Sequence, residues 1–476
     1  MRRLLALLIP VTLSAQIVVD TVVHLPSFII NGYYINELDK LYLIGWREHY
    51  ALDCSTYQLR ARIPRPSEKN YAYYSWNWRG QKLYISLDIN VGEDSLAVVD
   101  AVADTLIRWI PHVRGAGVYV GSSDRFYRPV AHTLVALDCS TDTVVSTIPA
   151  PDSAYGFSHP TWDAVHNKLY VALDAFGLPP KLAVYDCATE SLLTLIDVPR
   201  RPGVMNFDYA DHKAYYTNWD NGGPAGAIDI EHDSVIRAFP FQSAPLHNGV
   251  ALDTIDRKAY ILGADTLTGY SALYVVDCAT DSIVKMLTFP RRPWGVDHLR
   301  WVPWSNRVYL TRTQAPSHAD VGMYVVDCNT DSIIVSDLVL GYYPPFEFQI
   351  DPIRERVFAI GCESTSVHVL RDTGYGGIAD AKPGRLGLSL GLQVQMSDGG
   401  FDVRYTLASP SRVVLSAYDL MGREVRRLVA EKQSAGWHSV VWNCHDRNDS
   451  PAARGVYFIR LTAQGFSDVK KAVVTR

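Results

Sequence analysis

Apolar runs of four to six residues follow one another along most of this chain, and polar or turn-forming residues separate them. In the middle of the chain, KLYVAL, LAVYD and LLTLID alternate with segments that contain Asp, Asn, Gly or Pro. Such runs are typical of short strands joined by turns. Because no amphipathic helical pattern is sustained anywhere, the sequence predicts an all-β protein.

This strand pattern repeats. Each copy carries an aromatic residue in a KLY-like signature, and most copies then carry a segment similar to VVDCATDSIV. The interval between aromatic residues grows from 42 residues at the first pair to 49 at the last. The aromatic positions are Tyr42, Tyr84, Tyr127, Tyr170, Tyr215, Tyr260, Tyr309 and Phe358. Four short strands in each unit of about 40 to 50 residues predict the blades of a β-propeller.

The two ends of the repeat array predict how the ring closes. The eighth copy, roughly residues 346–371, offers only three strands, whereas IVVDTVVHLP at residues 17–26 has no partner of its own. Pairing these two segments would remove two exposed sheet edges. We therefore predict an eight-bladed propeller over residues 17–371, with seven blades as the alternative.

Five copies place a cysteine directly after an aspartate, which could mark a metal or nucleophile site or only a structural turn. The cysteines are Cys54, Cys139, Cys187, Cys278 and Cys328, and two further copies carry Ala101 and Ile230 instead. Equivalent points on separate blades should lie too far apart for a disulfide or a shared metal. The pattern favours a turn in which Asp and Thr bond to nearby backbone N–H groups.

The recurrence of KLYV followed by VVDCATDSIV resembles the YVTN-type β-propeller repeats of secreted and surface-layer proteins. The resemblance covers about residues 17–371 and lies in the recurrence, not in any single copy. WD40 and kelch signatures are not shown consistently by these units.

The N-terminus reads as an export signal. Arg2 and Arg3 precede an apolar run from Leu4 to Leu13, and small residues follow. This layout predicts a signal peptide over residues 1–15, with a buried N-terminal strand as the alternative. The net charge of −5 argues against a nucleic-acid binder, which would show a basic domain.

The composition and the pattern of the sequence change after the predicted propeller. Residues 372–391 are rich in Gly and read as a linker, and residues 392–476 alternate apolar and polar positions like a small β-sandwich. AYDLMGREVRRL, AGWHSVVW, RGVYFIRL and KKAVVTR resemble the type A C-terminal sorting domain of type IX secretion and the related immunoglobulin-like domain of flagellar hook-capping proteins. The resemblance implies that the secretion machinery recognises this domain; a plain accessory sandwich is the alternative.

The catalytic and metal-binding spacings His-Glu-x-x-His and Cys-x-x-Cys are missing. Asn218, Asp220 and Asn221 could supply oxygens to calcium, although a polar turn explains them better. The better candidate is positional, because connections between second and third strands, and between successive blades, meet at one rim. The predicted ligand-binding residues at this rim are Arg200, Arg201, Arg291, Arg292, Trp294, Trp46, Trp219 and Tyr342.

Arginine forks and aromatic faces at one rim can bind an anionic or sugar-bearing partner. A solvated rim whose Arg-Pro pairs only shape turns is the alternative. The sequence thus predicts a secreted or outer-surface bacterial binding protein, not an enzyme, with a polysaccharide, peptide or envelope protein as partner. A propeller hydrolase or lyase is the alternative, and no cofactor or metal is predicted.

Overall fold

The computed structural model describes the propeller region and the C-terminal region in separate stretches. The described residues are 17–45, 47–64, 71–88, 95–111, 116–218, 223–243, 249–264, 271–289, 298–312, 322–338, 340, 345, 347–361, 365–372, 392–397, 400–407, 411–419, 423–433, 436–448, 450–463 and 466–474. They form two compact units, one made of Ser14–Val302 and Asn306–Thr373 and the other containing Gly374–Arg476. Within these stretches, no helix is both long and apolar enough to cross a membrane. The predicted signal peptide lies outside the described residues.

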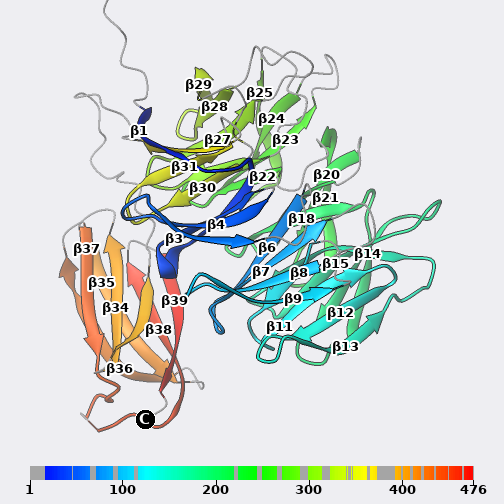
Figure 1. Ribbon diagram of the computed structural model, residues 1–476. Coiled ribbons are helices and arrows are strands. Elements are labelled where there is room, and N and C mark those ends of the chain that lie inside the picture. The colour runs from blue at the N-terminus through cyan, green and yellow to red at the C-terminus, as the bar shows by residue number, and fades with distance from the viewer. Residues whose placement is uncertain are drawn as a thin grey trace, which may run out of the picture. The chain divides into compact units, whose positions relative to one another are not determined.

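The first unit consists of eight antiparallel blades of four strands (Figure 1). Blade 1 contains β2 (Ile29–Ile35), β3 (Lys40–Gly45), β4 (Glu48–Asp53) and β5 (Leu59–Pro64), with the short 3-10 helix η1 (Asn36–Leu38) between β2 and β3; blade 2 contains β6 (Tyr71–Asn77), β7 (Lys82–Asp88), β8 (Ser95–Asp100) and β9 (Thr105–Pro111). Blade 3 contains β10 (Val118–Val120), β11 (Arg125–Val130), β12 (Thr133–Asp138) and β13 (Thr143–Pro149); blade 4 contains β14 (Gly156–Asp163), β15 (Lys168–Asp174), β16 (Lys181–Asp186) and β17 (Leu192–Asp197). Blade 5 contains β18 (Pro202–Asp208), β19 (Lys213–Asn218), β20 (Gly223–Asp229) and β21 (Ser234–Ser243); blade 6 contains β22 (Val250–Asp253), β23 (Lys258–Ala264), β24 (Ser271–Asp277) and β25 (Ser282–Thr288). Blade 7 contains β26 (Leu299–Val302), β27 (Arg307–Arg312), β28 (Gly322–Asp327) and β29 (Ser332–Leu338); blade 8 contains β30 (Glu347–Asp351), β31 (Arg356–Ile360), β32 (Ser366–Asp372) and β1 (Ile17–His24).

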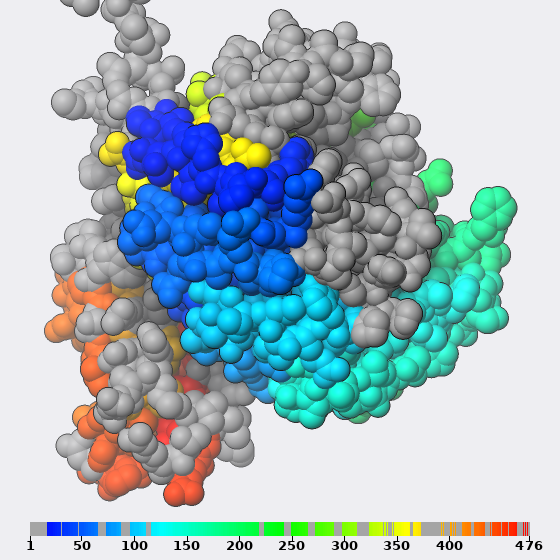
Figure 2. Space-filling view, in the orientation of Figure 1, coloured from blue at the N-terminus to red at the C-terminus, as the bar shows by residue number. Residues whose placement is uncertain are grey.

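The ring is closed by the first strand of the chain. β1 pairs antiparallel with β32, from Ile17 opposite Asp372 to His24 opposite Ser366. Figure 2 shows these N-terminal residues in dark blue against the yellow residues of the last blade. The inner strands of successive blades contact one another, and β30 contacts β2. The predicted eight blades and the predicted closure are both confirmed.

Blades 5 and 6 are also joined at an edge. The end of β21 pairs with β23 through Gln242 opposite Ala264 and Ser243 opposite Gly263, so the two blades share one continuous sheet.

Apolar side chains fill the spaces between blades. Leu83 and Ile85 of blade 2, for example, pack in one cluster with Tyr42 and Ile44 of blade 1. Among the described residues, corresponding clusters lie at six other junctions. Because each blade buries its faces only against its neighbours, the core depends on the closed ring.

Polar clamps also link neighbouring blades. At the junction of blades 6 and 7, the hydroxyl of Tyr260 donates to Asp331 over 2.6 Å, and Nζ of Lys258 lies 2.7 Å from the same carboxylate. The basic and tyrosine residues of one blade bind an acidic residue of the next at seven junctions: Lys40 and Tyr42 to Asp104, Lys82 and Tyr84 to Asp142, Arg125 and Tyr127 to Glu190, Lys168 and Tyr170 to Asp233, Lys213 and Tyr215 to Asp281, Lys258 and Tyr260 to Asp331, and Arg307 and Tyr309 to Asp372. The KLY signature therefore has a structural function.

The eighth junction replaces this clamp. Blade 8 carries Phe358 in place of the tyrosine, and blade 1 carries Tyr57 in place of the acidic residue. The two rings pack edge to face with centroids 6.5 Å apart, which is a favourable aromatic geometry. Arg356 turns to Asp20 of β1 in its own blade, with Nε 2.8 Å from Oδ2. The seam is thus held by an aromatic contact and by the N-terminal strand.

The Asp-Cys turns are structural, as predicted. Asp138 Oδ1 accepts hydrogen bonds from the backbone N–H groups of Ser140 and Thr141, and the other copies repeat this arrangement. The five cysteines are buried free thiols. Burial raises the pKa of Cys139, Cys187 and Cys278 to about 12, so these thiols stay protonated at neutral pH.

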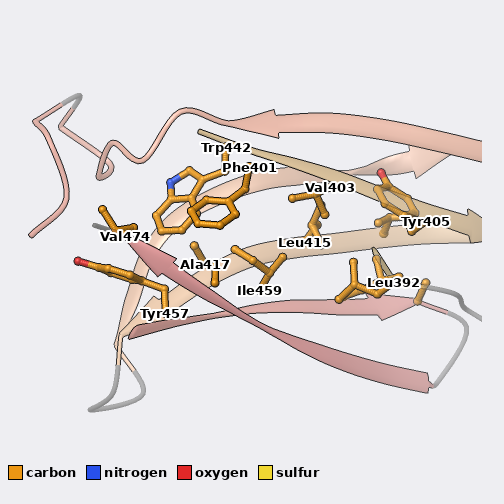
Figure 3. Close-up of a cluster of buried hydrophobic side chains, with 14 residues drawn as sticks. Leu392, Phe401, Val403, Tyr405, Leu415, Ala417, Trp442, Tyr457, Ile459 and Val474 are labelled. Carbon is orange, nitrogen blue, oxygen red and sulfur yellow. The ribbon is translucent and has the colours of Figure 1, made fainter. Parts of the chain in front are cut away.

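The second unit is a two-sheet β-sandwich. One sheet contains β33 (Gln393–Ser397), β34 (Gly400–Leu407) and β37 (Gly436–Trp442). The other contains β36 (Glu424–Gln433), β35 (Ser411–Asp419), β38 (Gly455–Ala463) and β39 (Phe466–Val474). Figure 3 shows Trp442 and Phe401 of the first sheet packed over Ala417 and Ile459 of the second. This apolar layer gives the unit a core of its own.

Candidate functional site

The strand order of the blades defines two rims. The connections from second to third strands and from one blade to the next form one rim, which we call the loop rim. The turns from first to second and from third to fourth strands form the opposite one, the turn rim. An ion pair between Arg201, which precedes β18, and Asp174, which ends β15, joins the two kinds of connection at the loop rim. At the turn rim, N–H of Cys187 bonds to the carbonyl of Asn167 in the same way.

Two of the eight predicted rim residues, Arg200 and Arg201, lie among the described residues. Both stand directly before β18 at the loop rim, so the structure places them at the predicted edge. The other six, Trp46, Trp219, Arg291, Arg292, Trp294 and Tyr342, lie outside the described residues. Their grouping with the first two therefore stays a prediction.

The two arginines point toward different blades. Nη1 of Arg201 lies 2.8 Å from Oδ2 of Asp174 in blade 4, and its side chain is mostly buried. Arg200 is exposed and crosses Gly223 in blade 5, where an added Cβ would come within 2.1 Å of its Cγ. Gly223 thus makes room for the arginine stem. Arg200 offers its guanidinium to solvent, whereas Arg201 already has a carboxylate partner.

The loop rim also carries an exposed aromatic residue that the sequence analysis did not select. Phe176 lies in the connection between β15 and β16 and is fully exposed, and Leu178 beside it is exposed as well. Gly177 between them has a φ of 76°, which favours glycine. The signal was present in AFGLPP, where an aromatic residue is followed by turn residues.

The predicted calcium ligands are only partly described. Nδ2 of Asn218 donates to the carbonyl of Pro224 over 2.6 Å, which ties the two ends of the connection between β19 and β20. Asp220 and Asn221 lie outside the described residues. The observed contact of Asn218 fits the alternative of a polar turn.

A buried carboxyl group stands on the inner strand of blade 8. Oε2 of Glu347 accepts from N–H of Gly32 at 3.0 Å, and Oε1 accepts from Nε2 of Gln349 at 2.7 Å. The hydroxyl of Tyr74 donates to Oε2 from 3.4 Å. Burial raises the pKa of Glu347 to about 7. Because both oxygens bind neighbouring groups of blades 1, 2 and 8, this carboxyl group holds the ring at its seam.

Comparisons with known proteins agree with this architecture. Residues 391–466 match the family described as the FlgD Ig-like domain. The crystal structure of BamB from Moraxella catarrhalis is similar to 75% of this chain and 100% of its own, with a TM-score of 0.54 and 12% identity. Dihydro-heme d1 dehydrogenase NirN is similar over 66% of each chain, with a TM-score of 0.51 and 12% identity. No curated protein matches the sequence. The chain is thus a β-propeller followed by an immunoglobulin-like domain.

Proposed function

We propose that this protein is an exported, non-enzymatic binding protein of the bacterial outer surface, and that its loop rim binds an anionic or sugar-bearing partner. The observation that supports it best is Arg200, an exposed arginine at the loop rim whose stem crosses Gly223. In the sequence, VPRRPGV and FPRRPWGV place an arginine pair in two connections between blades, before blade 5 and before blade 7. Phe176 adds an exposed aromatic face on the same rim.

Charge and geometry decide which partner fits. A guanidinium donates two parallel hydrogen bonds to a carboxylate or sulfate, and an aromatic ring stacks on the apolar face of a sugar. An acidic polysaccharide offers both features. Since Asp174 already neutralises Arg201, we assign most of the attraction to Arg200, together with Arg291 and Arg292.

Replacement of Arg200, Arg291 and Arg292 by Ala is expected to weaken binding to an acidic polysaccharide such as alginate at least tenfold. The matched control is Arg108→Ala, which removes an exposed arginine from the outer strand β9. Binding is measured on a glycan and peptide array and then by calorimetry. Equal binding by the triple variant and the wild type would remove the rim proposal. Release of soluble fragments from the polysaccharide would instead support the hydrolase or lyase alternative.

The proposal extends to the export route. The propeller is proposed to belong to the YVTN-type repeat class, and the immunoglobulin-like domain is proposed to be a type A sorting domain of type IX secretion. Residues 1–15 are proposed to be the signal peptide that directs the chain across the inner membrane first. A chain truncated after Asp372 is then expected to remain in the periplasm, while the full chain reaches the cell surface. Fractionation and surface labelling in a host with this machinery measure the difference. Surface display of a folded truncated chain would contradict the sorting role and would support the alternative of a plain accessory sandwich.

A further inference from the structure

Three potential metal ligands meet at the turn rim, between blades 4 and 5. They are His166 in the turn after β14, His212 in the turn after β18, and Glu231 in the turn after β20. One ligand atom of each lies within 4.8 Å of the others. The seven residues of β18 separate this cluster from Arg200 and Arg201 by about 20 Å, so it is not part of the loop rim.

The turns that carry these residues are fixed by hydrogen bonds. Oδ1 of Asp163 accepts from the backbone N–H groups of Val165 and His166, at 2.9 and 3.1 Å. Oδ1 of Asp229 accepts from N–H of Glu231 at 2.9 Å. His212 occupies a left-handed turn position with a φ of 54°. The backbone of the cluster is therefore already organised before any ligand binds.

One imidazole is oriented by a buried carboxylate. Nδ1 of His166 lies 2.7 Å from Oδ2 of Asp163, whose side chain is fully buried. This contact assigns the ring proton to Nδ1 and leaves the lone pair on Nε2 directed away from Asp163. A carboxylate behind a histidine in this way is the usual second partner of a metal-binding imidazole.

At two other junctions, the corresponding positions hold oppositely charged partners. Asp211 of blade 5 pairs with Arg257 of blade 6, and Arg354 of blade 8 pairs with Asp39 of blade 1. At the junction of blades 4 and 5, these two turn positions hold His166 and His212. Two imidazoles cannot form an ion pair with each other, whereas they can share a cation.

From this geometry we propose that His166, His212 and Glu231 bind a divalent transition metal of the zinc class and link blades 4 and 5. Nε2 of His166, Nδ1 of His212 and a carboxylate oxygen of Glu231 are the ligands. Nδ1 of His212 and Oε1 of Glu231 are 3.1 Å apart, close to the edge of about 3.3 Å in a tetrahedral zinc site.

The composition and exposure of the cluster define the site further. His212 and Glu231 are about half exposed, at 54% and 46% of the side chain, so both can rotate toward His166. Two imidazole nitrogens and one carboxylate suit zinc and not calcium or magnesium, which prefer oxygen ligands. Three protein ligands leave a fourth position for water or a partner's side chain. The site departs from the sequence-based expectation of no metal.

The test is zinc binding by the full chain after treatment with a chelator, measured by calorimetry. One equivalent is expected to bind, and His166→Gln or His212→Asn is expected to weaken binding at least tenfold. Asn is chosen because it tolerates the left-handed backbone of His212. His232→Ala is the matched control, since His232 lies in the same turn as Glu231 but bonds to Asp229 at 2.9 Å.

Two further measurements make the result decisive. Cobalt in place of zinc should give a visible absorption spectrum that the His166 and His212 variants lose and the His232 variant keeps. Thermal unfolding in chelator should be the same for all three variants and the wild type, which shows that the substitutions leave the fold intact. Failure to bind one equivalent of zinc, or equal affinity in the His166, His212 and His232 variants, would overturn the proposal.

Discussion

A chain that lacks residues 17–24 is expected to lose the cooperative unfolding of the propeller. β1 is the outer strand of blade 8, and its deletion exposes the edge of β32 over the whole paired segment from Ser366 to Asp372. The deletion also removes Val23 from the apolar cluster between blades 8 and 1, and it removes the ion pairs of Asp20 with Arg356 and Arg371. At about 1 kcal/mol for each lost hydrogen bond, the sum is on the order of 5 kcal/mol, comparable to the whole stability of many domains.

Urea unfolding followed by tryptophan fluorescence, together with size-exclusion chromatography, measures this effect. The control is a chain that begins at Ile17, which retains β1 and should unfold cooperatively. A deletion variant that stays monomeric with the same urea midpoint would show that blade 8 is complete without β1. Aggregation of the deletion variant alone is the outcome that the exposed strand edge predicts.

The second large effect is expected for Asp372→Ala. The side chains of Asp372 and Arg307 pair while both are fully buried, and the hydroxyl of Tyr309 donates to the same carboxylate over 2.7 Å. Without the carboxylate, a buried guanidinium loses its counter-charge, which typically costs about 3 to 5 kcal/mol. The free energy of unfolding should fall by this amount, as measured by urea denaturation.

Arg62→Ala provides the comparison for this prediction. Arg62 pairs with Glu48 near the surface, with 53% of the arginine side chain exposed, so its loss should cost less than about 1 kcal/mol. Tyr309→Phe should fall between the two, because it removes one hydrogen bond and leaves the ion pair in place. If Asp372→Ala and Arg62→Ala were equally mild, the buried clamp would not hold blades 7 and 8 together.

The fold could be predicted because every blade repeats the same local sequence signals. Alternating apolar runs, Asp-containing turns and the KLY signature define strands and turns at short range, and the orphan segment at residues 17–26 indicates the closure. The contacts between blades could not be predicted in the same way. Tyr215 and Asp281 are 66 residues apart and belong to two repeats, so nothing in either copy alone reveals their hydrogen bond.

The candidate sites were less accessible from the sequence for the same reason. The arginine pairs could be assigned to the loop rim from their place in the repeat. The sequence did not reveal, however, that Arg201 is bound to Asp174 while Arg200 remains exposed. His166 and His212 are 46 residues apart and belong to two different repeats. Their proximity follows from the stacking of neighbouring turns, and the role of Asp163 depends on side-chain orientation, which the sequence does not contain.

The pairing of β1 with β32 also determines the order in which the blades of the propeller can fold. The partners are more than 340 residues apart in the chain, since Val23 lies opposite Val367. Bringing such distant segments together is penalised by chain entropy, and contacts of high sequence separation slow folding. Blades 1 to 6 have all their strands once synthesis passes Thr288, whereas blade 8 and its junction with blade 7 must wait for Asp372. Completion of the circle is therefore the last event in the folding of the propeller, and a partly synthesised chain still has an open ring.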